Sequence, residues 1–279
     1  MSTKASTKAK RGMHGVCALT GKEGKFVKSH ILPRALTLIS RNGDKVREAE
    51  IGGIPRRRPP TWYDDQLVIR GGEDILESID TPAIETLRSH KLIWSAFPKD
   101  GSIPDLGVRQ IHESLGMRSL VFSDSEIENL RLFFLSIVWR AAASLRPEFI
   151  HVQLEDEEKE NLRQRVLSCA SGDFFEYPII LDQLITRGDP HNRVPILESC
   201  EFPGEGGAES MSVDSVRIYM DGLVARVLIT ADEGLAKNLS IMCLGAGDET
   251  LVIARSFEKS RASDNMREVI VDNISRGYS

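Results

Sequence analysis

The most regular hydrophobic pattern of the chain lies in residues 123–146. Apolar side chains recur there at the i, i+3, i+4 and i+7 spacing of an amphipathic helix: Ile127, Leu130, Phe134, Ile137, Val138, Ala141 and Leu145. Two alternative capping boxes stand at its start: Ser123 with Glu126, and Ser125 with Glu128. Pro147 ends the run, and the pattern predicts a core helix. Its most apolar stretch, residues 132–139, is bracketed by Arg131 and Arg140 and is too short to span a bilayer.

Three further segments are predicted to be helical. One helix begins after Pro33, which suits a first helical turn, and runs towards Arg41. Another covers residues 73–90, with an interruption near Pro82. A third, more exposed helix covers residues 155–170 and stops at Gly172.

From residue 177 the pattern changes to short segments rich in Val, Ile and Leu. They predict strands over residues 177–181, 213–220, 223–230, 239–244 and 250–255. Asp221-Gly222 between two of them is a signal for a type I′ hairpin turn. Near the other end of the chain, Gly21 to Gly24 form a turn between two short extended pieces of a hairpin or knuckle.

These elements predict an α+β fold. A small irregular N-terminal module is followed by central helices and a C-terminal antiparallel β-sheet. We divide the chain into a flexible basic arm (1–14), the module (15–95), a helical region (96–172) and a β-rich region (173–279). Residues 52–60 form an irregular connector within the module.

Charge is distributed unevenly along the chain. Residues 1–60 hold 14 Lys and Arg against 4 Asp and Glu, whereas the remainder holds 22 against 37. A basic segment on an acidic body steers polyanions, so nucleic acid is the expected partner of this segment. The alternative is a solvated tail around Lys4 to Arg11 and a simple loop at Arg56 to Arg58.

The remaining composition favours a cytoplasmic protein without a membrane partner. The first ten residues lack the apolar core of a signal peptide. The four cysteines (Cys17, Cys169, Cys200 and Cys243) show no paired spacing, as expected of free thiols in a reducing compartment. The sequence gives no prediction of oligomeric state.

His30 is the candidate for acid–base chemistry. It precedes Ile31-Leu32-Pro33, and Arg34 lies one helical turn further on, where its guanidinium would reach a phosphate. The alternative is a histidine that only satisfies a hydrogen bond in a hairpin. His90, His112, His151 and His191 lack the paired spacing of metal ligands.

The residues around His30 carry a resemblance to a known family. Cys17-x-x-Thr20-Gly21-Lys22, followed by Ser29-His30-Ile31-Leu32-Pro33-Arg34, resembles HNH-like (ββα-metal) nuclease-related proteins of bacteria and phages. Their pattern runs C-x-L-C-G-K and then S-H-I-I-P-K. A later L-L-C-x-x-C-E in those proteins is matched here by residues 67–73, and specific motifs thus cover residues 17–73.

The chain departs from this pattern at its zinc site. The resemblance implies four thiolates, but Thr20, Ile69 and Gly72 stand where three of them belong, and only Cys17 remains. Structural zinc requires four sulfur or nitrogen ligands, so no structural zinc is expected. Apolar packing is predicted to hold the module together instead, with Ile69 filling the space of the metal.

The resemblance also implies a catalytic arrangement. His30 would be the general base, and Glu73 would help to hold Mg²⁺ or Mn²⁺ in metal-assisted hydrolysis of a phosphodiester. Ser29 stands where many HNH nucleases have an aspartate ligand. Residues expected to contact nucleic acid are Lys28, Arg34, Arg56, Arg57 and Arg58.

Three hypotheses therefore remain open. The first is an HNH-like endonuclease. The second is a catalytically inactive, zinc-free scaffold derived from that fold, which binds nucleic acid or another protein. The third is an unrelated structural or assembly protein in which the C-terminal sheet carries the function.

Overall fold

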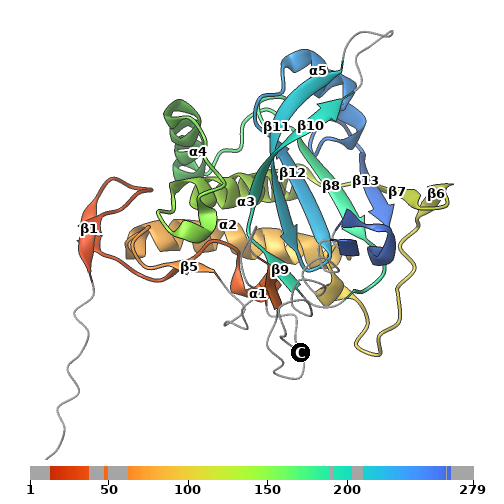
Figure 1. The fold of residues 1–279 in the computed structure, drawn as a ribbon, viewed down its shortest axis with the longest axis horizontal. Helices are drawn as coiled ribbons and strands as arrows, with labels where there is room; N and C mark the ends of the chain where they lie inside the picture. Colours follow the sequence, from red (N-terminus) through yellow and green to blue (C-terminus); the bar gives the residue numbers. More distant parts are fainter. Residues whose placement is uncertain are drawn as a thin grey trace, which may run out of the picture.

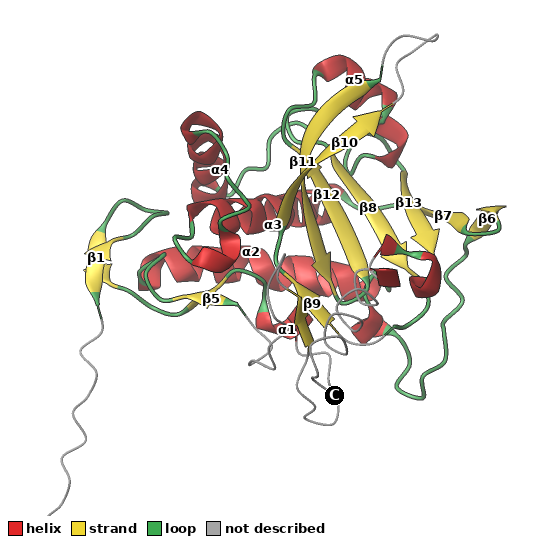
Figure 2. Ribbon diagram, in the orientation of Figure 1, coloured by secondary structure: helices red, strands yellow, loops and turns green. Residues whose placement is uncertain are grey.

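The computed structural model describes residues 13–37, 47–49, 62–188, 191–202, 210–261 and 263–264. Most of the predicted basic arm and the whole of the predicted connector, residues 52–60, lie outside these ranges. The chain has an α+β fold, as its sequence predicts: a large sheet stands against a layer of helices (Figures 1 and 2). Among these residues, no helix has both the length and the apolar character that a membrane crossing requires.

The sheet joins seven described strands in the order β10-β11-β12-β8-β13-β7-β6. Their bounds are β6 Arg109–His112, β7 Leu115–Leu120, β8 Ile179–Leu184, β10 Ile196–Phe202, β11 Met211–Met220, β12 Leu223–Leu228 and β13 Thr250–Arg255. Neighbouring strands are antiparallel except β8 and β13, which are parallel. Asp221 and Gly222 join β11 to β12 with positive φ angles of 45° and 81°, which confirms the predicted hairpin.

Helix α3 (Asp124–Ala143) is the core helix that the hydrophobic pattern predicts. Ser123 caps it: its hydroxyl accepts a hydrogen bond from the backbone N–H of Glu126, whose carboxylate accepts one from the backbone N–H of Ser123. Every residue from Leu130 to Ala141 is buried, because the sheet, α2 and α4 (Asp156–Ser168) surround the helix. Leu145, predicted to extend the apolar face, lies beyond the helix end and is exposed.

Helix α2 (Arg70–Ser89) differs from the prediction because it runs through Pro82 without a break. Proline removes one backbone hydrogen bond from a helix, which usually interrupts it. Here Leu76, Ile79 and Leu87, on both sides of Pro82, are buried against the main core. Tertiary packing of this face therefore outweighs the local cost.

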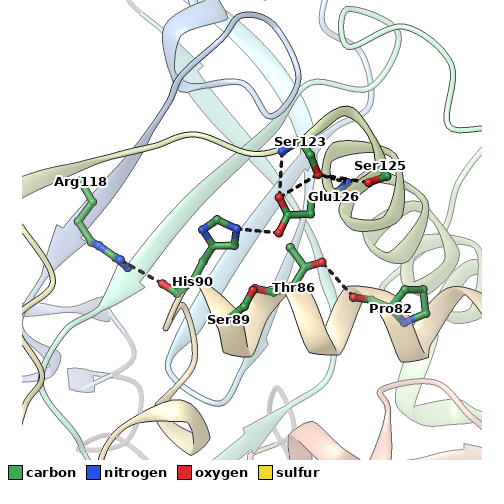
Figure 3. Close-up of polar contacts among 8 residues, drawn as sticks. All are labelled: Pro82, Thr86, Ser89, His90, Arg118, Ser123, Ser125 and Glu126. Atoms are coloured by element: carbon green, nitrogen blue, oxygen red, sulfur yellow. Dashed lines mark hydrogen bonds and ion pairs between the residues drawn. The ribbon is translucent and has the colours of Figure 1, made fainter.

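Helix α2 ends against α3 and the sheet through His90 (Figure 3). The His90 ring contacts the Glu126 carboxylate at 2.9 Å, while the His90 carbonyl accepts a hydrogen bond from Arg118 at 3.0 Å. His90 is thus a structural connector.

The N-terminal module contains two small antiparallel strand pairs. Strands β1 (His14–Val16) and β2 (Glu23–Lys25) form the predicted hairpin. Strand β3 (Ser29–His30) pairs with β5 (Tyr63–Asp64), and α2 follows β5. Helix α1 (Arg34–Thr37) begins directly after Pro33. Strand β3, strand β5 and helix α2 together form a ββα arrangement.

Two segments correct the predictions. The expected strand over residues 239–244 is wrong: Asp232 caps helix α5 (Glu233–Asn238), a 3₁₀ turn follows, and only Cys243 bridges to the sheet. The region 96–172, predicted to be helical, also contributes β6 and β7. Outside the sheet, β4 (Arg47–Ala49) pairs in parallel with β9 (His191–Arg193).

Candidate functional site

A pocket of about 420 Å³ lies within the N-terminal module, between residues 27–35 and helix α2. Strand β3 supplies His30, and α1 supplies Arg34 at its first position. Helix α2 lines the pocket with an acidic stripe at i, i+4 and i+7: Glu73, Glu77 and Asp80. Lys28 and Arg70 complete its charged lining. The pocket thus brings together four residues singled out from the sequence: Lys28, His30, Arg34 and Glu73.

His30 has a half-buried ring that is positioned through its backbone. Its carbonyl oxygen accepts a hydrogen bond from Nη1 of Arg140 at 2.9 Å. The ring meets Tyr63 edge-on, with centroids 6.3 Å apart, and neither ring nitrogen forms a hydrogen bond within the described part of the chain. Burial, Lys28 and Arg34 lower the pKa of His30 below 6.5. The imidazole is therefore neutral at neutral pH, the form in which it accepts a proton.

Glu73 stands on the first turn of α2. Burial raises the pKa of its carboxyl above the usual value, while nearby Ser29 and Arg140 act in the opposite direction. Oε2 of Glu73 and Oγ of Ser29 are both buried, and neither completes a hydrogen bond with the residues described. The carboxylate therefore lacks a full set of partners.

Asp80 is fully engaged by a buried arginine. Nη1 and Nη2 of Arg140 donate to its two carboxylate oxygens at 3.0 and 2.7 Å. Because the guanidinium also binds the His30 carbonyl, it fastens β3, α2 and α3 together. Asp80 is consequently a structural anion rather than a free ligand.

The cations of the pocket differ in their availability. Arg70 forms ion pairs with Asp74 at 2.6 Å and Glu77 at 3.5 Å. Lys28 and Arg34 are exposed and form no ion pair among the described residues. The ammonium of Lys28 lies 3.7 Å from the centre of the Tyr63 ring. Two cations beside His30 are therefore free to meet an anion.

The four positions of the degenerate zinc site converge in space. The backbone N–H of Thr20 donates to Sγ of buried Cys17 at 3.4 Å. A Cβ atom at Gly72 would lie 2.8 Å from the same sulfur. Ile69, at the start of α2, packs against the main core, and its carbonyl oxygen accepts a hydrogen bond from the backbone N–H of Gly72.

This arrangement does not fit a zinc ion. Gly72 has no side chain, Ile69 offers only carbon atoms, and the close approach of Gly72 to Cys17 fills the space. More generally, the described residues contain no cluster of three His, Cys, Asp or Glu side chains that would hold a metal ion.

Two residues of the site were not predicted from the sequence, and three predicted residues lie outside the described part of the chain. Arg56, Arg57 and Arg58 fall outside the described residues. Asp80 and Arg140 were not predicted as part of the site. The sequence does hold a signal for each of them. Asp80 lies at i+7 from Glu73, on the same face of a helix, and Arg140 ends an apolar helical run, where a buried arginine needs an acidic partner. Trp62, close in sequence to Arg58, is buried and packs in the core, so it cannot stack on a base of nucleic acid.

Comparison of the chain with protein-family models, curated proteins and solved structures gives no match.

Proposed function

We propose that this protein is an HNH-like endonuclease that cleaves phosphodiester bonds in nucleic acid with His30 as general base. One observation carries the proposal: His30 on β3 and Glu73 on α2 line the same pocket of a ββα arrangement. The order of these elements, the histidine on the first strand and the acid on the helix agree with the motif resemblance.

The base step follows from the state of His30. A neutral imidazole with unbonded ring nitrogens removes a proton from a water molecule in the pocket. The hydrogen bond from Arg140 holds the backbone of His30 and leaves the ring free. Lys28 and Arg34 disfavour the protonated ring and attract the phosphate.

Glu73 would hold a Mg²⁺ or Mn²⁺ ion, completed by water and by the phosphate of the substrate. Two observations support a cation here: Oε2 of Glu73 is buried without a hydrogen-bond partner among the described residues, and burial raises the pKa of the carboxyl, a cost that a bound cation would offset. When bound, the ion polarises the phosphate and stabilises the leaving oxygen. Asp80 is assigned no metal in this proposal because its charge is paired with that of Arg140.

Nicking of supercoiled plasmid by the purified protein tests this proposal. We expect nicking with Mg²⁺ or Mn²⁺ that is lost with EDTA, in His30→Ala and in Glu73→Gln. His112→Ala is the matched control, because His112 is an exposed histidine on edge strand β6. Retained nicking in folded His30→Ala would overturn the assignment of the base.

A binding scaffold without catalysis is the second candidate. It is favoured by the ion pairs of two pocket carboxylates, Asp80 with Arg140 and Glu77 with Arg70, and by the absence of a cluster of three metal-binding side chains among the described residues. A folded wild-type protein that binds DNA without nicking it, and loses binding in Lys28→Met with Arg34→Gln, would establish this function instead.

A further inference from the structure

The face of the sheet that points away from α2 and α3 carries a row of charged side chains. In Figures 1 and 2 this face is turned towards the viewer, with the two helices behind the sheet. Side chains alternate along each strand, and residues such as Val216, Ile218 and Val227 point into the helix-covered core. The intervening positions supply the row, one from each of five neighbouring strands: Glu198, Arg217, Arg226, Asp182 and Arg255.

Two arginines of this row stand directly opposite each other. Arg217 of β11 and Arg226 of β12 are register partners, a like-charge arrangement that destabilises a sheet unless anions compensate it. Glu198 is the nearest anion: it lies 3.1 Å from Nε of Arg217 and 3.8 Å from Nε of Arg226. The same carboxylate also binds Arg261 at 3.0 Å.

Asp182 is shared in the same way. It contacts Arg255 at 2.9 Å and lies 3.9 Å from Nη1 of Arg226. Among the described residues, four guanidinium groups thus share two carboxylates, which leaves an excess of two positive charges.

The deepest arginine has an unused donor. The side chain of Arg217 is 4 % exposed, and its Nη2 has no hydrogen-bond partner among the described residues. Arg226, Arg255 and Arg261 are 25 %, 30 % and 63 % exposed, so solvent reaches their guanidinium groups. A buried guanidinium with one unsatisfied N–H group, behind three accessible guanidinium groups, is an arrangement that an anion would complete.

We propose that this arginine row binds a phosphate group. A phosphate carries close to two negative charges at neutral pH, which matches the excess charge of the row together with Arg261. Its oxygens accept the paired N–H groups that guanidinium presents, and it would separate the opposed Arg217 and Arg226. The phosphate belongs either to free phosphate or a nucleotide, or to a nucleic-acid backbone.

Thermal unfolding and calorimetric titration test this site. The 279-residue chain is measured in sodium phosphate and in sodium chloride of equal ionic strength. We expect phosphate to raise the Tm of the wild type, because a ligand that binds only the folded state stabilises it. Arg226→Gln should bind phosphate at least about tenfold more weakly. Its Tm in chloride should equal or exceed that of the wild type, because the substitution removes a like-charge pair.

The control is Arg165→Gln, which changes an arginine of similar exposure (20 %) on α4 and should keep the full phosphate response. Arg255→Gln provides a second weakened variant that does not depend on the folding of Arg226→Gln. Equal Tm values of the wild type in phosphate and chloride, or equal responses of all three variants, would overturn the proposal.

Separate titrations distinguish the two sources of phosphate. Inorganic phosphate and a nucleoside monophosphate represent the free ligand, and a short single-stranded oligonucleotide represents the backbone. An Arg226→Gln effect confined to the oligonucleotide assigns the row to nucleic acid, and one seen with all three assigns it to the phosphate group itself. Loss of nicking in His30→Ala and Glu73→Gln tests the His30 pocket, whereas the phosphate response of Arg226→Gln tests the row, so either proposal can fail without the other.

Discussion

Arg140 and Asp80 form a bidentate ion pair between α3 and α2, with the guanidinium 1 % exposed and the carboxylate 17 % exposed. The same guanidinium donates to the His30 carbonyl and to Ser136. This pair therefore sets the position of the candidate base relative to the acidic face of α2.

Removal of Asp80 should destabilise the protein strongly. Asp80→Ala leaves the buried Arg140 without a counter-ion, and we expect the free energy of unfolding to fall by about 3 kcal/mol. Asp74→Ala is the control: it removes an acid of the same helix from a pair with Arg70 whose side chains are 55 % and 67 % exposed. Its effect should stay within about 0.5 kcal/mol. Urea denaturation measures both, and similar losses for the two variants would contradict the assigned role of the ion pair.

The neighbouring glycines Gly71 and Gly72 should respond to alanine with opposite signs. Alanine favours a helix over glycine, and a Cβ at exposed Gly71 meets no atom within 4 Å, so Gly71→Ala should stabilise by about 0.5 kcal/mol. At Gly72 the Cβ would lie 2.8 Å from Sγ of Cys17 and 3.0 Å from Cβ of Val68. Gly72→Ala should therefore destabilise by about 1–3 kcal/mol. Thermal unfolding of both variants checks this, and a stable Gly72→Ala protein would show that the space beside Cys17 is open.

Asp221 should make stability depend on pH. Burial raises the pKa of its carboxyl to about 6, although the backbone N–H of Ser95 donates to Oδ2 at 3.0 Å. The folded pKa exceeds the usual 3.8, so the folded state favours the protonated carboxyl. The resulting contribution of Asp221 to the free energy of unfolding is complete below pH 3.8 and is lost as pH rises through about 6.

Asp221→Asn should remove that dependence. The amide keeps an acceptor for Ser95 and tolerates the φ of 45°, so we expect a gain of about 3 kcal/mol at pH near 8 and little change near pH 4. Urea denaturation at the two pH values measures it. Exposed Asp214→Asn should leave the pH dependence as in the wild type, and an unchanged profile in Asp221→Asn would refute the prediction.

The ring of His30 should titrate below pH 6.5, because burial, Lys28 and Arg34 oppose its protonation. Lys28→Met should raise its pKa towards the ordinary value, since Lys28 is the cation that lowers this pKa most. NMR titration of the ring protons measures both values independently of activity. In a nicking assay the acidic limb of the rate profile should move to higher pH in the same variant. A His30 pKa at or above 6.5 in the wild type would exclude the electrostatic arrangement described for the pocket.

The sequence by itself determined the elements whose signals are local. Helix α3 follows from its spacing and the Ser123 cap, the β11–β12 hairpin from Asp221-Gly222, and β13 from a run of β-branched residues. The α+β class and the nearness of Lys28, His30 and Arg34 also follow from local order along the chain.

Tertiary structure decided what depends on distant partners. Helix α2 continues through Pro82 because one face packs against the core, and β6, exposed along its length, is a strand only because β7 pairs with it. No local pattern places Asp80 opposite Arg140, since this pair joins separate helices. The hairpin register places Arg217 opposite Arg226, but their anions Glu198 and Asp182 come from other strands of the sheet. Charge pairing between distant segments depends on the three-dimensional arrangement of the chain, and that arrangement gives His30 its position and the arginine row its excess charge.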